Sequence, residues 1–203
     1  MKTIIGIDPG FMGGIAVIEA PVLGTDEVVH AFTMPILTTK KPPRKGKKSM
    51  RTEFSYDGPN IRWAFKLGWE VESIAYIEKQ QARPRFDRSL WNPVTKKFGK
   101  MVNPSIQSTQ NLFDGYGLLR GVLIGLGIPF VEVPPKVWQA VMFVEFEGTV
   151  IQDTKAASIQ IAQRMFPDLD LRRSPRCKTP HDGICDALMI AEYGRRVEGG
   201  EIV

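Results

Sequence analysis

Two short β-branched runs at the start of the chain constrain its fold more than any other feature. They cover 3–8 (TIIGID) and 13–18 (GGIAVI), and the turn-forming residues Pro9, Gly10 and Gly13 separate them. Apolar runs of this length around a glycine-rich turn are typical of a β-hairpin, and the first run is apolar enough to be a buried strand. The chain must therefore complete a sheet around this hairpin.

Later segments indicate how the sheet is completed. Further strands are expected at 28–33, 73–78 and 129–133. Helices are expected from Asp57 to Gly68, over 108–126 with Ser108 as a possible N-cap, from Pro134 as a short piece, over 153–165 and over 182–196. This order predicts an α/β fold with a mixed five-stranded sheet flanked by helices. With 203 residues, a single domain over 1–203 is the simplest organisation.

Positive charge is concentrated in polar segments. The net charge is +5, and the basic residues cluster in 39–51, 83–100 and 172–178. The first cluster falls within 35–56, and the second falls within 84–107 except for Arg83. Both segments are too long for simple connections and are predicted to be inserted basic loops. Such segments can neutralise nucleic-acid phosphates, although solubility or disorder could explain any single run.

The side chains expected to contact DNA lie in these segments. They are Lys40, Lys41, Arg44, Lys45, Lys47, Lys48, Arg83, Arg85, Phe86, Arg88, Trp91, Lys96, Lys97, Arg172 and Arg173. Phe86 and Trp91 stand between basic residues, so we expect them to stack on bases that are unpaired at a DNA crossover. The alternative is that Trp91 and Phe98 only anchor the loop to the domain.

Two carboxylates stand at the ends of apolar strands. Asp8 ends the run 3–8, and Glu78 ends the run 73–78. An acid on such a run costs free energy unless it is paired or binds a metal ion. Taken singly, Asp8 could cap the turn that follows, and Glu78 could pair with Lys79 or a nearby arginine. Together, the two acids indicate a shared site.

Two more acids lie at the start of the last expected helix. Asp182 and Asp186 are four residues apart, so both can project from one helix face toward the sheet. Asp182 could instead cap the helix. Asp186 is embedded in the apolar stretch 184–191, which is not a solvent-facing surface.

Four acids from two strands and one helix suit two divalent cations that clamp the oxygens of a phosphodiester. Oxygen ligands favour Mg²⁺, with Mn²⁺ able to substitute, over zinc. Because no Ser-His-Asp or Cys-His arrangement is evident, the expected nucleophile is a metal-bound water. His181 could orient that water or replace Asp182 as the fourth ligand.

These residues resemble the RuvC family of Holliday-junction resolvases, in its divergent phage and chloroplast branch. The motifs that carry the resemblance are IIGIDPGFMGGIAVI, AYIEKQQARP, STQNLFDGYGLLRGVLIGLGIPFVEVPPKVWQAVMF, DTKAASIQIAQRMFP and HDGICDALMIAEYG, in family order. The resemblance implies an RNase H-like fold and a Mg²⁺-dependent crossover junction endodeoxyribonuclease that acts on four-way junctions.

The resemblance also implies roles for single residues. Asp8, Glu78, Asp182 and Asp186 would be the metal-binding catalytic acids, and Lys155 would contact the scissile phosphate. The last two acids are four residues apart here, whereas bacterial members have them three apart. Bacterial members also place a second lysine where this chain has Trp138, so that phosphate contact is expected to be lost or moved.

The resemblance further implies a homodimer, because a four-way junction has two symmetric strands to cut. The apolar face of 108–126 is the expected dimer surface, with Gly115, Gly117, Gly121 and Gly125 permitting close backbone approach. Packing of this face against the sheet is the other explanation, and the two are compatible.

Three other functions match part of the sequence. Actin-like and sugar-kinase folds also place a turn of this type after a first strand, but they need two related domains, for which 203 residues leave no room. A non-catalytic protein that binds branched DNA would use the basic segments, but its four acids would repel phosphate. Another RNase H-like nuclease, acting on RNA–DNA hybrids or flaps, remains an alternative.

The two cysteines, Cys177 and Cys185, are expected to be free thiols, with Cys185 packed in the core. No apolar run reaches the roughly 18 residues of a membrane-spanning helix. We therefore expect an intracellular protein without a cleaved leader or a membrane partner, in the cytoplasm of a bacterium or a phage-infected cell, or in an organelle.

Overall fold

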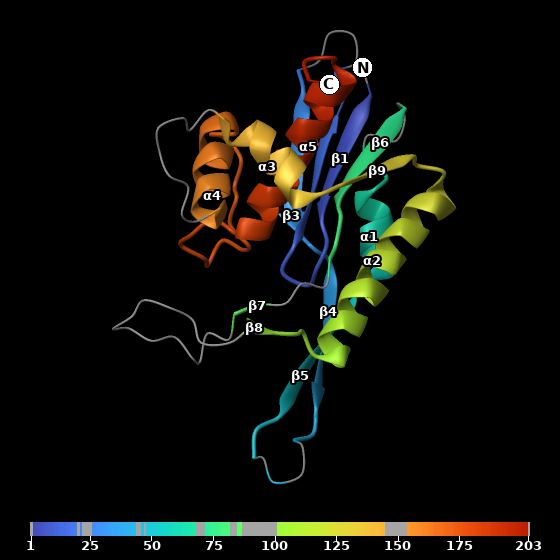
Figure 1. Cartoon of the computed structure of the whole chain (residues 1–203), viewed down its shortest axis with the longest axis vertical. Helices are drawn as coiled ribbons and strands as arrows, with labels where there is room; N and C mark the ends of the chain where they lie inside the picture. The colour runs from blue at the N-terminus through green and yellow to red at the C-terminus, as the bar shows by residue number, and fades with distance from the viewer. Residues whose placement is uncertain are drawn as a thin grey trace.

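The computed structural model describes residues 2–19, 21, 26–43, 46, 48–67, 72–81, 85–86, 101–144 and 154–202. Its centre is a five-stranded sheet with the strand order β3-β2-β1-β6-β9 (Figure 1). The strands are β1 (Thr3–Asp8), β2 (Gly14–Glu19), β3 (Val28–Thr33), β6 (Ser73–Glu78) and β9 (Phe130–Val133). β1, β2 and β3 form an antiparallel meander, whereas β6 is parallel to β1 and β9 is parallel to β6. The predicted mixed five-stranded sheet is confirmed.

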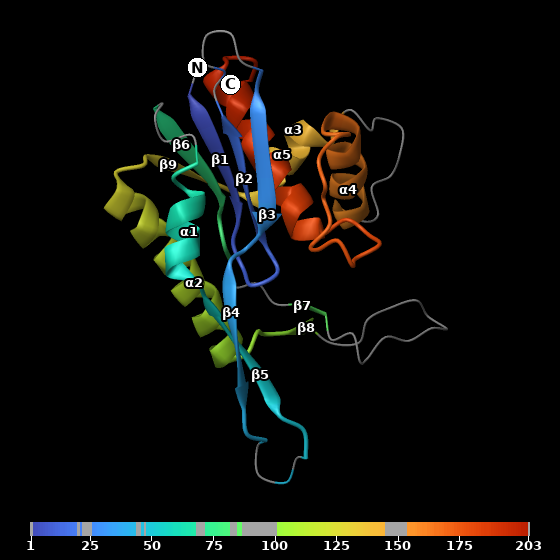
Figure 2. The same ribbon diagram turned by 180° about the vertical axis from the view of Figure 1, so that it is seen from behind.

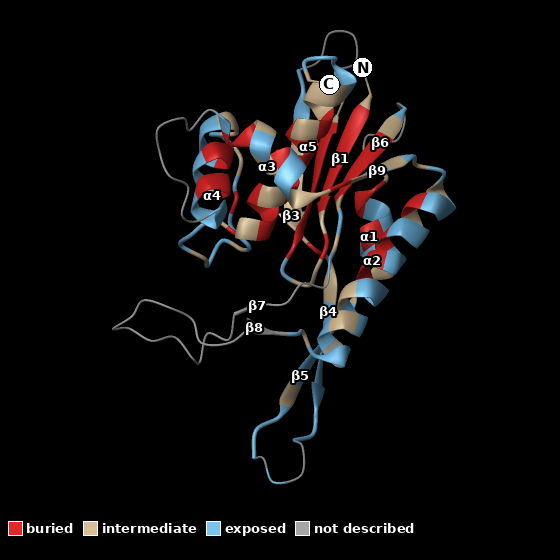
Figure 3. Cartoon of the chain, in the orientation of Figure 1, coloured by how far each residue is buried: buried red, intermediate tan, exposed pale blue. Residues whose placement is uncertain are grey.

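Helices cover both faces of this sheet (Figures 1 and 2). One face packs against α5 (Asp182–Glu198), beside which lie α3 (Pro135–Met142) and α4 (Thr154–Met165). The other face is covered by α1 (Gly58–Ala64) and α2 (Ile106–Leu126). The buried residues, red in Figure 3, follow the strands and the inward sides of the helices.

Each face of the sheet has its own apolar core, because successive strand residues point to opposite faces. Ile4 and Tyr76 belong to the core with α5, whereas Ile5 and Ile7 belong to the core with α1 and α2. This alternation decides on which face each strand-end acid lies.

Three glycines let α5 approach the sheet closely. A Cβ on Gly6 of β1 would lie 2.2 Å from the Ala187 carbonyl oxygen, and one on Gly14 of β2 would lie 2.5 Å from the Gly183 carbonyl oxygen. A Cβ on Gly183 itself would meet the Met12 carbonyl oxygen at 2.3 Å. The first half of α5 therefore rests backbone to backbone on β1, β2 and the turn between them.

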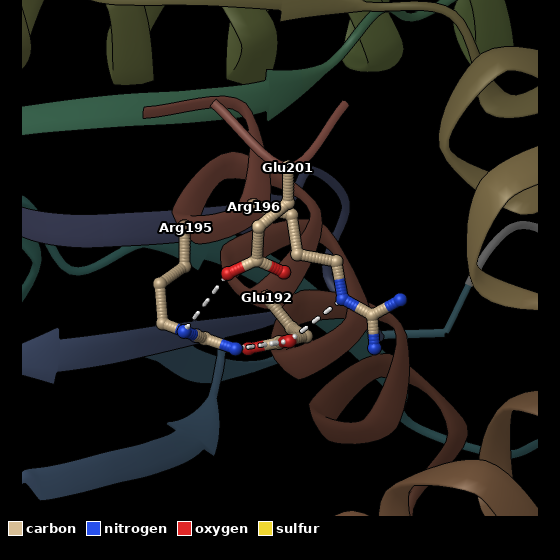
Figure 4. A network of polar contacts seen from close by, with 4 residues as sticks. All are labelled: Glu192, Arg195, Arg196 and Glu201. Atoms are coloured by element: carbon tan, nitrogen blue, oxygen red, sulfur yellow. Dashed lines mark hydrogen bonds and ion pairs between the residues drawn. The ribbon is translucent and has the colours of Figure 1, made fainter. Parts of the chain in front are cut away.

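A charged network fixes the other end of α5 (Figure 4). Glu192 is buried, and it accepts hydrogen bonds from Arg195 and, at 2.9 Å, from Arg196. Arg195 also lies 3.7 Å from the Glu201 carboxylate. A buried carboxylate that is bound by two guanidinium groups does not remain an uncompensated charge.

Two further pairs of strands extend beyond the sheet. β4 (Ile36–Lys41) and β5 (Arg51–Tyr56) form an antiparallel hairpin, and β7 (Arg85–Phe86) pairs with β8 (Met101–Val102). Figures 1 and 2 place both pairs at the end of the sheet where β1 and β6 finish. The sequence predicted the insertions 35–56 and 84–107 but not the strands within them.

Some helix ends differ from those predicted. Ser105, not Ser108, caps α2, because the Ser105 hydroxyl accepts a hydrogen bond from the Ser108 backbone N–H at 3.1 Å. α1 begins beside Asp57 as expected, with Asp57 as its N-cap, but the helix ends at Ala64 rather than near Gly68. Cys185 is buried in the core, as predicted, and neither cysteine forms a disulfide. Among the residues described, no helix is both long enough and apolar enough to cross a membrane.

The close approach of α5 predicts that Gly6→Ala is destabilising. Its Cβ would meet the α5 backbone, which cannot rotate away as a flexible side chain would, so we expect a loss of about 2 kcal/mol in the free energy of unfolding. Urea denaturation followed by circular dichroism measures this loss. The matched control is Gln160→Ala at an exposed residue of α4, which should change the free energy of unfolding by less than about 0.5 kcal/mol. Equal stability of the two variants would contradict the close packing.

Candidate active site

Asp8 and Glu78 lie side by side at the C-terminal ends of two inner strands of the sheet. β1 and β6 are parallel neighbours paired through Ile7 and Ile77, so the next residue of each strand is an acid at the same level. Neighbouring strands are about 4.8 Å apart. Asp8 shares the face of Ile4, and Glu78 shares the face of Tyr76, so both acids lie on the side of the sheet that α5 covers.

α5 brings the other two acids to the same end of these strands. His181 is its N-cap residue, and Asp182 is its first helical residue rather than its cap. Asp186 follows one turn later, on the same face of the helix. Because Gly183 packs on Met12 and Gly13, this first turn is held beside the β1–β2 turn that follows Asp8.

The four acids interact electrostatically. Burial, followed by the negative charges of Glu78, Asp186 and Asp182, raises the pKa of Asp8 well above its usual value. Burial also raises the pKa of Glu78 to about 7 and the pKa of Asp186 to about 6, and a neighbouring carboxylate contributes to each shift. Sites that concentrate buried like charges in this way are often functional.

Lys155 supplies positive charge to this cluster. Its ammonium group, on α4, donates a hydrogen bond to Asp182. Burial opposes ionisation of Asp182, but the hydrogen bond and charge of Lys155 outweigh it, so the pKa of Asp182 is lowered. The same bond raises the pKa of Lys155. The sequence nominated Lys155 only through the family resemblance, and the structure brings it to the acids.

Trp138 holds Glu78. This tryptophan of α3 is fully buried, and its indole N–H donates to a Glu78 carboxylate oxygen at 3.0 Å. Gln80 is a second, longer donor at 3.5 Å. The expected alternative for Glu78 was an ion pair with Lys79 or an arginine. From the sequence, Trp138 indicated only a lost phosphate contact and not this role, although a buried tryptophan normally requires a partner for its N–H.

His181 is buried with both ring nitrogens lacking a hydrogen-bond partner among the residues described. Burial, the largest influence, lowers its pKa, so the ring is neutral near neutral pH. A neutral imidazole beside Asp182 keeps a lone pair that could bind a cation or a water molecule.

The donor chemistry of this site matches a hard divalent cation. In the described part of the chain, no group of three or more His, Cys, Asp or Glu side chains is arranged to hold a metal ion as it stands. The site nevertheless gathers carboxylates whose pKa values are raised by burial and by neighbouring carboxylates, together with an imidazole that has no hydrogen-bond partner among the described residues. Oxygen donors of this kind prefer Mg²⁺ or Mn²⁺.

The turn after Asp8 links this site to two basic segments. Phe11 contacts the β4–β5 hairpin through Tyr56, and Met12 accepts a weak hydrogen bond from Arg173 through its sulfur, at 3.9 Å. The base of the β4–β5 hairpin and segment 172–178, which are far apart in sequence, therefore both contact the turn that follows Asp8.

The structure locates some of the predicted DNA-binding residues. Lys40 donates to Thr52, Lys41 pairs with Glu53, and Arg172 pairs with Asp170, while Lys48 lies in the exposed part of the hairpin. Arg173 donates to the Met12 sulfur, and the remaining ones lie outside the described residues or have only their backbone described. They are Arg44, Lys45, Lys47, Arg83, Arg85, Phe86, Arg88, Trp91, Lys96 and Lys97.

Comparison with known proteins gives structural likenesses alone. No protein-family model and no curated protein sequence matches this chain. Among solved structures, the chain is similar to T. thermophilus RuvC in complex with a Holliday junction substrate, at 13% identity and a TM-score of 0.49 over 98% of this chain and 96% of that chain. A second Thermus thermophilus RuvC structure gives 14% identity and a TM-score of 0.47 over the same shares. Likenesses at this level leave the assignment of function to the residues themselves.

The raised pKa values predict how the stability of the metal-free protein depends on pH. Glu78 and Asp186 hold protons more tightly in the folded state than in the unfolded state. Their contribution to stability is therefore fully present below their ordinary pKa values and is lost as the pH rises through about 6 to 7. Asp186→Asn should stabilise the metal-free protein by about 1–3 kcal/mol at high pH and have little effect near pH 4, where the wild-type group is protonated.

Chemical denaturation in EDTA at several pH values measures this effect. Asp168→Asn, at an exposed surface acid, is the matched control and should change little. A pH-independent effect of Asp186→Asn would show that the carboxylate is not under electrostatic strain.

Proposed function

We propose that this protein is a metal-dependent DNA endonuclease that cuts four-way junctions. The observation that carries the proposal is the cluster of four carboxylates at one edge of the sheet, with pKa values of about 7 for Glu78 and about 6 for Asp186. A cluster of partly buried like charges costs free energy in the metal-free protein, and a divalent cation would reduce that cost. The basic segments beside it are suited to a polyanionic substrate.

In this proposal Asp8, Glu78, Asp182 and Asp186 hold two Mg²⁺ ions, or Mn²⁺ in their place. Bound there, the ions would supply Lewis-acid stabilisation of the phosphodiester oxygens and a water activated at neutral pH. Trp138 fixes the orientation of Glu78 through its indole N–H, which can donate to the carboxylate without competing for the cation. Lys155, already at Asp182, is the side chain positioned to neutralise a phosphate beside the site.

DNA, rather than a small phosphoester, is the proposed substrate because of the charge around the site. The base of the hairpin and segment 172–178 both contact the turn that follows Asp8, through Phe11 and Met12. A branched molecule presents phosphates in several directions, which such a divided basic surface can contact together. RNA–DNA hybrids, flaps and purely non-catalytic binding are the competing functions.

We also propose that the protein acts as a homodimer through α1 and α2. Trp63 of α1 is 61% exposed, and a cavity of about 530 Å³ beside it is lined by Gly58, Pro59, Arg62, Trp63, Lys66, Leu118 and Val122. A Cβ added at Gly117, Gly121 or Gly125 of α2 would meet nothing within 4 Å, whereas one at Gly115 would meet the Tyr56 ring. Gly115 therefore serves packing within the chain, and the other three leave room for a second copy.

The catalytic proposal predicts that Asp8→Asn, Glu78→Gln and Asp186→Asn each lower junction cleavage by at least 100-fold while sparing junction binding. The carboxylates would hold the metal, and the basic segments would hold the phosphates. The assay offers a synthetic four-way junction, a duplex, a flap and an RNA–DNA hybrid with Mg²⁺. Asp168→Asn is the control and should cut normally. Full activity of Asp186→Asn would refute the assignment of the catalytic acids. Preferential cleavage of the RNA–DNA hybrid would identify the hybrid, rather than the junction, as the substrate.

The dimer proposal predicts that Trp63→Asp converts the protein to a monomer. Trp63 is the most exposed aromatic residue of the proposed interface. An aspartate there would place a charge in an apolar contact, and desolvating that charge costs free energy. Analytical ultracentrifugation gives the mass, and Val28→Asp, at an exposed apolar residue of β3, should remain dimeric. A monomeric wild-type protein, or a dimeric Trp63→Asp variant, would contradict this interface.

A further inference from the structure

We infer that Phe54, on the β4–β5 hairpin, and Phe11, on the turn after Asp8, form a stacking surface for one DNA base beside the carboxylate site. The inference rests on the proposed function for the identity of its ligand. It adds a base-contacting site to the phosphate contacts expected of the hairpin.

The register of the hairpin places the relevant residues on one face. Phe54 pairs with Thr38, and Thr52 pairs with Lys40. Paired residues of an antiparallel ladder, and residues two apart on one strand, share a face. Phe54, Tyr56 and Lys40 therefore line the same face, and Lys40 donates to Thr52 across it at 2.7 Å.

This face is joined to the carboxylate site through Phe11. The Phe11 ring centroid lies 4.7 Å from that of Tyr56 and 5.9 Å from that of Phe54. Phe11 follows Asp8 by three residues, and the charge of Asp8 contributes to the raised pKa of Tyr56 after the larger effect of burial. The aromatic cluster and the first catalytic acid are thus parts of one local structure.

Tyr56 and Phe54 differ in exposure and therefore in role. Tyr56 packs against the core beneath α2, and its ring lies where a Cβ on Gly115 would be. Phe54 is 41% exposed and belongs to neither apolar core, nor does Phe11. Tyr56 is therefore the anchor of the hairpin, whereas Phe54 presents a ring to solvent.

Charge complementarity points to a nucleic acid as the occupant. The sequence from 36 to 56 contains seven basic residues and a single acid, Glu53. Glu53 pairs with Lys41 on the opposite face of the hairpin, so it does not oppose Lys40 beside Phe54. An aromatic ring flanked by Lys side chains binds single-stranded nucleic acid by stacking on a base while phosphates are held nearby. A base unpaired at the branch point, close to the scissile phosphate, is the ligand that this surface fits.

Photocrosslinking tests the contact directly. A four-way junction with 5-iododeoxyuridine at the branch point is bound in EDTA, so that cleavage plays no part, and crosslinked peptides are identified by mass spectrometry. We expect the crosslink on Phe54 or Phe11, and none when the same nucleotide lies within a duplex arm. A crosslink confined to other residues would overturn the inference.

Affinity measurements in EDTA give the second readout. Phe54→Ala should weaken binding of the junction about 10-fold, as for loss of one stacked base, with the salt dependence of binding unchanged because no charge is removed. Leu37→Ala, at a residue 52% exposed on the other face, is the matched control and should bind normally. Lys40→Ala should lower the salt slope by about one. An unchanged affinity, or an equal loss for a perfect duplex, would overturn the stacking role.

These outcomes separate the inference from the proposed function. If Phe54→Ala cleaves and binds junctions normally, the result supports the nuclease function and contradicts the stacking surface. If binding depends on Phe54 but no substrate is cleaved, the result supports the stacking surface and contradicts the nuclease function. A protein that binds no DNA would remove both.

Discussion

The partial burial of four neighbouring carboxylates at one end of the sheet is the constraint on which this molecule depends. Asp8 and Glu78 are placed together by the parallel pairing of β1 and β6, and Asp182 and Asp186 are added by α5. Burial and mutual repulsion raise the pKa of three of these acids, and Lys155 lowers that of the fourth. The fold tolerates this cost because the apolar cores on both faces of the sheet hold the strands and α5 in place.

The features that create the cluster also connect it to the surface. Glycine packing brings the first turn of α5 onto the loop between β1 and β2. That loop contacts the hairpin through Phe11 and segment 172–178 through Met12. The turn that follows Asp8 is therefore in direct contact with both elements that carry basic residues. This proximity is the physical basis for proposing one polyanionic substrate rather than separate acidic and basic functions.

The sequence predicted the elements whose side-chain pattern is strong. The apolar runs that end in Asp8 and Glu78, and the apolar stretch around Asp186, were sufficient to predict the central strands, the last helix and the acids as a group. The hairpin was missed because its strands, ILTTKK and RTEFSY, are largely exposed and polar, so no buried face reveals them. The bond from Trp138 to Glu78 joins residues 60 positions apart and follows only from the packing of α3 against the sheet.

The central claim is that the carboxylate cluster binds divalent cations. A crystal structure with Mn²⁺, analysed by anomalous scattering, tests it most directly. The account predicts two Mn²⁺ peaks about 4 Å apart among Asp8, Glu78, Asp182 and Asp186, with the Lys155 ammonium displaced from Asp182. The absence of a peak at these acids at millimolar Mn²⁺, with the bond from Lys155 to Asp182 intact, would contradict it.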